Sequence, residues 1–209
     1  MLSVLWTVAA LGGVGSLGED VSYPLCSRNH EKLSELNKFT SEDSHLGASL
    51  AMLGDVDGDG VEDIAVGVPG DSHGEPENQN AGSVLIVLRK KDGGVKKAYK
   101  WPTTSEQFAY AKGDRFGWSL AGIQDLDRDG VPELVVGIRG YDITGKPDSG
   151  AFATLFLNGE GEVKSWALTS ALREQELAEL DEFGSALANI GDIDGDKVDD
   201  IAVGAHKCD

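Results

Sequence analysis

Carboxylates recur at a fixed alternating spacing in three short segments of this chain. The segments read DVDGDGVED from residue 55, DLDRDGVPE from residue 125 and DIDGDKVDD from residue 192. Four acids in nine residues repel one another unless a cation lies among them, and hard oxygen ligands at this spacing suit Ca²⁺. Positions 1, 3, 5 and 9 would bind through side chains: Asp55, Asp57, Asp59 and Asp63; Asp125, Asp127, Asp129 and Glu133; Asp192, Asp194, Asp196 and Asp200. Position 7 would bind through its backbone carbonyl: Val61, Val131 and Val198.

Two other interpretations of these segments are weaker. A single solvated acidic turn would be unremarkable, but three such turns in register favour ion ligation. An EF-hand would need a glutamate at position 12 and flanking helices. Position 12 is instead Val66, Val136 and Val203, each inside a β-branched run. The sequence therefore predicts up to three calcium ions, held by loops that join strands.

The elements around each acidic segment repeat as well. A small-residue strand start precedes each segment, and a glycine-bounded apolar run follows it. Such short β-branched runs are typical of buried strands. The segments begin 70 and 67 residues apart, and a long fixed period indicates a repeat architecture. The first two units continue into a third strand (82–88 and 150–157) and an outer strand (95–101 and 163–168).

Four short antiparallel strands per repeat are the unit of a β-propeller blade. A blade buries its faces only by stacking on neighbours. We therefore predict an all-β fold, a partial β-propeller with units 46–115, 116–182 and an incomplete 183–209. Propellers close with 4–8 blades, so we expect an open arc that belongs to a larger parent chain or an oligomer. Residues 19–45 form an N-terminal segment that could supply an outer strand.

The combination of Phe-Gly strand starts with these acidic loops resembles the FG-GAP repeat, the blade of the integrin α-chain N-terminal propeller. The resemblance rests on Phe116-Gly117, Phe183-Gly184, the acidic loops and the Gly-x-Pro-Gly run at 67–70. It covers about residues 46–209 and implies an extracellular calcium-stabilised recognition module. It also implies that calcium lies on one face of the disc, and that ligands meet the opposite face.

Some residues depart from that pattern. Leu46 stands where the pattern has Phe, and loop 125–133 carries Arg128, Pro132 and Glu133. Lys197 stands at position 6 of the third loop, where glycine normally supplies the turn. A lysine forced to positive φ costs roughly 1 kcal/mol. These departures predict that the first loop is the best calcium site.

Composition narrows the classes of partner. Acidic residues outnumber basic ones 36 to 18, and the net charge of −18 disfavours nucleic acid or an anionic membrane as direct partners. Carboxylates in three equivalent loops do not form the paired acids of a glycosidase cleft. The four histidines follow no metal or triad spacing, so surface positions are expected. No catalytic residues are assigned, and we expect no enzyme activity.

The ends of the chain leave alternatives open. Residues 1–18 read as a secretory signal peptide with cleavage after Gly18, although the segment before the apolar stretch lacks Lys or Arg. The rival interpretation makes 3–8 the third strand of a truncated preceding blade. Cys26 and Cys208 could pair in an oxidising compartment, or remain unpaired or bond between chains. No other apolar stretch reaches the length of a membrane span.

These observations favour a secreted or cell-surface calcium-binding propeller module for adhesion or ligand recognition, with an extracellular protein or glycan as partner. The alternative is an accessory propeller of an extracellular hydrolase or lyase whose catalytic domain lies outside this chain. A downstream stalk and membrane helix would favour the first, and a neighbouring catalytic domain the second. The sequence does not identify the ligand, because recognition loops vary freely.

Overall fold

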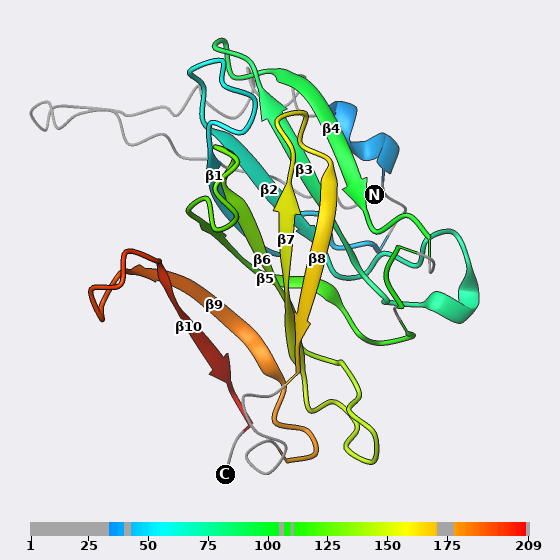
Figure 1. The fold of residues 1–209 in the computed structure, drawn as a ribbon. Helices are drawn as coiled ribbons and strands as arrows, with labels where there is room; N and C mark the ends of the chain where they lie inside the picture. Colours follow the sequence, from blue (N-terminus) through cyan, green and yellow to red (C-terminus); the bar gives the residue numbers. More distant parts are fainter. Residues whose placement is uncertain (1–33, 40–42, 105–106, 110, 171–177, 208–209) are drawn as a thin grey trace, which may run out of the picture.

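Ten strands and two short 3-10 helices make up the protein in the computed structural model (Figure 1), which describes residues 34–39, 43–104, 107–109, 111–170 and 178–207. The strands are β1 (Leu50–Gly54), β2 (Asp63–Val68), β3 (Ser83–Arg89), β4 (Val95–Trp101), β5 (Phe116–Ile123), β6 (Glu133–Ile138), β7 (Ala151–Leu157), β8 (Val163–Thr169), β9 (Phe183–Gly191) and β10 (Asp200–Ala205). The helices are η1 (Ser34–Phe39) and η2 (Pro76–Asn78).

The strands form three antiparallel sheets in chain order. Sheet β1-β2-β3-β4 is blade 1, sheet β5-β6-β7-β8 is blade 2, and the pair β9-β10 is the described part of blade 3. The predicted four-stranded unit is therefore confirmed twice. The outer strand of blade 1 has the predicted bounds, and that of blade 2 extends one residue further, to Thr169.

Adjacent blades stack through close backbone approach. A Cβ built on Gly67 would lie 2.1 Å from Ser49 Oγ and 2.2 Å from the Gly117 carbonyl oxygen, so only glycine fits there. The Ser49 hydroxyl donates to that Gly117 oxygen at 2.8 Å, which joins blade 1 to blade 2. The same hydrogen bond recurs at the next junction, where Ser119 donates to the Gly184 oxygen at 2.7 Å. The repeated serines therefore bond across the junctions, in addition to being small enough to pack there.

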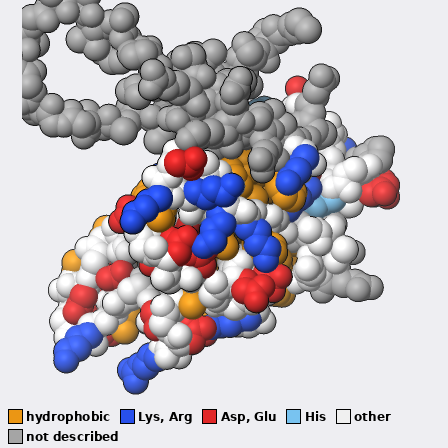
Figure 2. Space-filling view, turned by 90° about the horizontal axis from the view of Figure 1, so that it is seen from above, with side chains coloured by type: hydrophobic (Ala, Val, Ile, Leu, Met, Phe, Trp, Pro, Cys, Tyr) orange, Lys and Arg blue, Asp and Glu red, His pale blue; other side chains and the backbone are white. Residues whose placement is uncertain are grey.

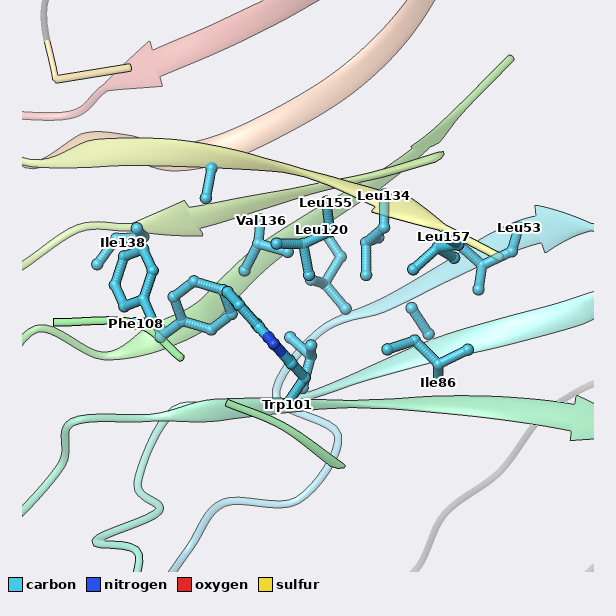
Figure 3. Packing of buried hydrophobic residues seen from close by; sticks show 14 of the residues in the cluster. Leu53, Ile86, Trp101, Phe108, Leu120, Leu134, Val136, Ile138, Leu155 and Leu157 are labelled. Atoms are coloured by element: carbon cyan, nitrogen blue, oxygen red, sulfur yellow. The ribbon is translucent and has the colours of Figure 1, made fainter. Parts of the chain in front are cut away.

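The main core lies between blades 1 and 2 (Figure 3). Strands β3 and β4 contribute Ile86 and Trp101, and blade 2 contributes Leu120, Leu134 and Leu155 from the facing strands. Trp101 is 6% exposed, and the centroid of its ring lies 5.7 Å from that of Phe108 and 5.4 Å from that of Phe116. Trp101 therefore packs in the interface between blades 1 and 2.

Within the described residues the three sheets form an open arc rather than a closed ring (Figure 1). At one end of the arc, β1 leaves Leu50 and Met52 about half exposed, at 49% and 51%. No described helix has the length and apolar content to cross a membrane.

The N-terminal part of the chain is described only from η1 onward. This 3-10 helix contacts β4, and its Leu36 is buried beside Val87 and Val95. The predicted signal peptide at 1–18, the rival strand at 3–8, and both Cys26 and Cys208 lie outside the described residues. Those predictions therefore remain predictions. The outer strand predicted within 19–45 does not include 34–39, which form the 3-10 helix, and it stays a prediction for the residues outside the described ranges.

Candidate metal centres

The three acidic segments form the connections between the first two strands of each blade. We call residues 55–63 loop 1, residues 125–133 loop 2 and residues 192–200 loop 3. Position 9 of each loop is the first residue of the second strand, namely Asp63, Glu133 and Asp200. In Figure 1 the loops lie at corresponding ends of their strand pairs. The propeller repeat therefore presents all three loops on one side of the arc.

The carboxylate at position 1 holds each turn closed from within. In loop 1, Asp55 accepts from the backbone N–H groups of Asp59 and Gly60 at 3.0 and 2.8 Å. In loops 2 and 3 the position-1 carboxylate accepts from the position-6 N–H at 2.7 and 2.9 Å. These are charge-assisted bonds, which are the stronger class. The three loops share this pattern although their sequences differ at positions 2, 4, 6, 8 and 9.

Positions 5 and 9 repeat the same contacts. The position-5 carboxylates of Asp59, Asp129 and Asp196 each accept from the N–H at position 7, at 3.0, 2.9 and 2.8 Å. The position-9 carboxylate accepts from the N–H at position 2, at 3.0 Å in loop 1 and 2.8 Å in loops 2 and 3. Both ends of each loop are thereby fixed to its acidic side chains.

The loops differ in how many acids they gather. Ligand atoms of Asp125, Asp127, Asp129 and Glu133 all lie within 4.8 Å of one another in loop 2. Loops 1 and 3 each gather three acids at that distance, from positions 1, 3 and 9. The position-5 residues Asp59 and Asp196 fall outside those two groups. Loop 2 therefore gathers one more acid than loop 1, and the ranking of loop 1 as the best calcium site stays a prediction.

The position-9 carboxylates of loops 1 and 2 are buried, where an ionised acid is unstable without a nearby positive charge. Asp63 and Glu133 are both 0% exposed. Burial raises the pKa of Asp63 despite the N–H groups that it accepts from, and it raises the pKa of Glu133 to about 7. Among the described residues, neither Glu133 Oε1 nor Asp57 Oδ1, both buried, has a hydrogen-bond partner. Buried polar oxygens are rarely left unpaired. One divalent cation in loop 1 would satisfy Asp57 Oδ1, and another in loop 2 would satisfy Glu133 Oε1. The residues present therefore fit Ca²⁺.

Sequence reasoning missed two lysines at this site. Lys96 of β4 places Nζ 2.8 Å from Asp57 Oδ2 and 2.6 Å from Asp59 Oδ2. Lys164 of β8 lies 2.7 Å from Asp127 Oδ2 and also contacts Asp129. Figure 2 shows Lys and Arg interspersed with Asp and Glu on this side of the molecule. The sequence marks these lysines only by the Val-Lys with which both outer strands begin, and that signal does not show that they reach the loops.

Loop 3 differs from the other two in strain and in surroundings. Lys197 at position 6 has a φ of 72°, the left-handed conformation expected where the pattern has glycine. Gly60 and Gly130 take the same position in loops 1 and 2, with φ values of 81° and 90°. Exposure also sets loop 3 apart, since Asp200 is half-buried and Ile193 is 71% exposed.

Other candidate residues lie at the opposite end of the blades. Asp114 belongs to the Lys-Gly-Asp tripeptide, but its side chain is buried and accepts from the Ala111 N–H at 2.6 Å. This burial excludes the tripeptide as an exposed adhesion motif. Trp118 is stacked under the Arg139 guanidinium, 3.5 Å from the ring centroid. The expectation of surface histidines is wrong for His73, whose side chain is 3% exposed beside Asp71, because its turn folds back onto β3 and β4.

Comparison with known proteins assigns the repeat. The FG-GAP repeat family matches residues 46–87 and 116–155, which contain loops 1 and 2 with the strands on either side. The chain contains two FG-GAP repeats. Its FG-GAP match covers β1 to β3 and β5 to β7, so the loops here have the strand setting of that family.

Curated relatives of this chain are integrin α chains. Integrin alpha-PS2 of Drosophila melanogaster is 31% identical over 173 residues, 79% of this chain and 12% of that protein. Human integrin alpha-IIb is 37% identical over 94 residues, 45% of this chain and 8% of that protein. Integrin alpha-5 of Xenopus laevis is 36% identical over 121 residues, 56% and 11% respectively. The chain thus spans about an eighth or less of each of these relatives.

Proposed function

We propose that this chain is a calcium-binding β-propeller module that serves adhesion or ligand recognition, outside the cell or on its surface. The observation that carries the proposal is the orphaned, fully buried Glu133 Oε1 among converging acids of an FG-GAP loop. The same hydrogen-bond pattern in loops 1 and 3 extends the proposal to three ions. Similarity to integrin α chains supports the adhesion role.

The ion-binding residues would be those at positions 1, 3, 5 and 9, with the carbonyl oxygen of position 7 completing the shell. Bound Ca²⁺ supplies two positive charges to each group of acids. The position-1 carboxylate keeps the turn closed, and the position-9 carboxylate would hold the ion beside the buried start of the second strand. Calcium would thus stabilise the strand pairs that carry the rest of each blade.

Recognition would take place at the opposite end of the blades, as the integrin resemblance implies. The connections from β2 to β3 and from β6 to β7, together with the segments that enter β5 and β9, lie there. An extracellular protein or glycan is the proposed partner. The net charge of −18 supports neither nucleic acid nor an anionic membrane as a direct partner. No catalytic role is proposed for any residue.

Calcium titration followed by calorimetry tests the binding step. We expect three sites with Kd of about 10⁻⁴–10⁻³ M, the range of extracellular calcium modules. Asp57→Ala and Asp127→Ala should each remove one site and leave two. Asp194→Ala should have a smaller effect because Lys197 already strains loop 3. Magnesium should bind poorly, since it demands tighter octahedral geometry.

Glu62→Ala provides the matched control, because Glu62 occupies position 8 of loop 1 and is exposed. It should leave all three sites intact. Absence of calcium binding by the folded chain would refute the proposed ion. Light scattering at several concentrations tests the open arc separately: we expect self-association through unpaired strand edges, and a compact monomer at every concentration would contradict it.

A further inference from the structure

Lysines occupy corresponding positions in the outer strands of blades 1 and 2. Lys96 is the second residue of β4, and Lys164 is the second residue of β8. Each side chain crosses from the outer strand to the acidic loop of its own blade. Lys96 donates to Asp59, which lies 37 residues earlier in the chain. Lys164 donates to Asp129, which lies 35 residues earlier. A contact that recurs in two blades at the same strand position is a property of the repeat.

The two ammonium groups engage loop positions 3 and 5. Lys96 Nζ lies 2.8 Å from Asp57 Oδ2 and 2.6 Å from Asp59 Oδ2, so a single cation bridges both acids. Lys164 bridges Asp127 and Asp129 in the same way. These are side chains that a calcium ion in the loop would also need. An ammonium group and Ca²⁺ a few Å apart repel each other strongly.

One ammonium group neutralises only part of each loop. Its single charge faces four acids, and the buried oxygens Asp57 Oδ1 and Glu133 Oε1 still have no partner among the described residues. The lysine therefore resembles a counter-cation that partly substitutes for the divalent ion. In the part of blade 3 that the structure describes there is no outer strand, and no lysine is paired with an acid of loop 3.

We propose that Lys96 and Lys164 are affinity-determining residues, which hold loops 1 and 2 in shape without calcium and must give up their acids when calcium binds. The inference rests on the proposed calcium function. Each lysine lowers the calcium affinity of its own loop, so the loop fills at a higher calcium concentration than its carboxylates alone would require. The same lysine keeps the calcium-free blade folded.

Two-dimensional NMR of the full chain can follow each loop separately during calcium titration. The backbone N–H groups of Gly60, Gly130 and Lys197 each donate to the position-1 carboxylate of their own loop and so report loops 1, 2 and 3. In Lys96→Met we expect the Kd of loop 1 to fall about tenfold, or about 1.4 kcal/mol, with loop 2 unchanged. Lys164→Met should show the reciprocal pattern. With chelator present, both variants should melt at a lower temperature than the wild type.

Two further variants isolate the charge. Lys97→Met is the matched control, because the neighbouring Lys97 pairs with the exposed Glu160 and should leave all three affinities unchanged. Lys96→Arg keeps the charge and should bind calcium about as weakly as the wild type. If Lys96→Met does not fold without calcium, Lys96→Gln removes the charge and keeps a hydrogen-bond donor.

The outcomes separate the two proposals. If Lys96→Met or Lys96→Gln binds calcium at loop 1 with wild-type or weaker affinity, the lysine does not oppose the ion and the inference is wrong. If none of the three reporter signals moves with calcium in the wild type or in any variant, the proposed calcium function itself fails.

Discussion

Buried carboxylates occur at both ends of the blades, but the protein neutralises them differently at each end. At the loop end, Glu133 and Asp57 keep buried oxygens without a partner among the described residues. At the opposite end, Asp71 is 3% exposed and accepts from Ser83 Oγ at 2.7 Å and Lys100 Nζ at 2.5 Å. Asp71 is therefore neutralised by a protein cation, whereas Lys96 and Lys164 at the loop end leave buried acid oxygens without a described partner.

The Asp71 cluster shows how complete this internal neutralisation is. Burial alone would raise the pKa of Asp71, but hydrogen bonds from Lys100 and Ser83 hold it below its ordinary value. His73 lies beside it, with Nδ1 3.6 Å from Asp71 Oδ2, and burial lowers the pKa of this imidazole. The Asp71 cluster thus holds its buried acid with a fixed protein cation, whereas the acids at the loop end keep buried oxygens without a described partner.

Removing Lys100, the protein cation beside Asp71, should have the largest effect on the free energy of unfolding. Lys100→Met leaves Asp71 buried without its main counter-charge, and breaking a buried pair costs about 3–5 kcal/mol. Urea denaturation at pH 7 and constant calcium would measure the loss in the free energy of unfolding. Lys97→Met is the control, since both partners of its surface pair with Glu160 are exposed, and it should change stability by less than about 1 kcal/mol. Equal losses in the free energy of unfolding would contradict the role of Lys100 as the cation that neutralises buried Asp71.

Removing calcium, the proposed cation of the loops, should have the next largest effect on stability. At millimolar calcium a site with a Kd near 10⁻⁴–10⁻³ M adds about 1 kcal/mol, so chelation of three sites should cost about 3 kcal/mol. Thermal melting with chelator and with calcium would show a lower melting temperature in chelator, and magnesium should restore it poorly. Identical melting curves would contradict calcium binding by the loops.

Replacing the buried Asp114 with a neutral residue should have a smaller effect, and it should increase the free energy of unfolding. Burial raises the pKa of Asp114 to about 6, and Asp142 and Asp148 add to the shift. Because folding raises this pKa, protonated Asp114 favours the folded state. Its contribution to the free energy of unfolding is complete below the unfolded pKa near 3.8 and is lost as the pH rises through about 6. Asp114→Asn should therefore raise the free energy of unfolding by about 1–3 kcal/mol at pH 7 and hardly at all below pH 3.8.

Chemical denaturation of wild type and Asp114→Asn at several pH values, at one calcium concentration, would show the difference growing between those limits. A difference that does not depend on pH would contradict the assignment. Because loop titration is common to both proteins, it cancels in this comparison.

Relief of backbone strain in loop 3 should have the smallest effect. Lys197→Gly places the residue that favours positive φ at a position with φ of 72°. Strain of about 1 kcal/mol would be removed, and the greater flexibility of glycine in the unfolded chain offsets part of it. We expect a gain of about 0.5 kcal/mol in chelator, measured by denaturation. Gly130→Ala should instead destabilise loop 2, where φ is 90°.

Much of the loop end could be predicted from sequence because its signals are local. The alternating acids, the valines at position 12 and the repeat of about 70 residues indicate strand, acidic loop and strand within one short window. The outer strand of blade 1 was also predictable, since its ends are marked by Gly-Gly before Val95 and by Pro after Trp101.

The neutralising partners could not be predicted, because they come from distant strands. Nothing near Asp71 in the sequence indicates that Lys100 reaches it, and nothing near loop 1 indicates Lys96. Lys-Gly-Asp at 112–114 has the composition of an exposed turn, yet the chain folds this aspartate against the N–H of Ala111. Which loop gathers four acids also depends on side-chain geometry that the motif leaves free.

The serine-to-glycine hydrogen bonds between blades have a mechanical consequence. Ser49 and Ser119 each bind the carbonyl oxygen of a glycine in the following blade, 68 and 65 residues further along the chain. A tension applied along the arc passes through these junctions one after another, so the load on each is the same and the weakest junction sets the yield point. Ser185 at the corresponding place in blade 3 donates to Gly204 of its own blade at 3.1 Å. The described arc therefore has two junctions of one design, each reinforced by a backbone hydrogen bond, from Phe116 N–H to Ala81 O and from Phe183 N–H to Ser149 O.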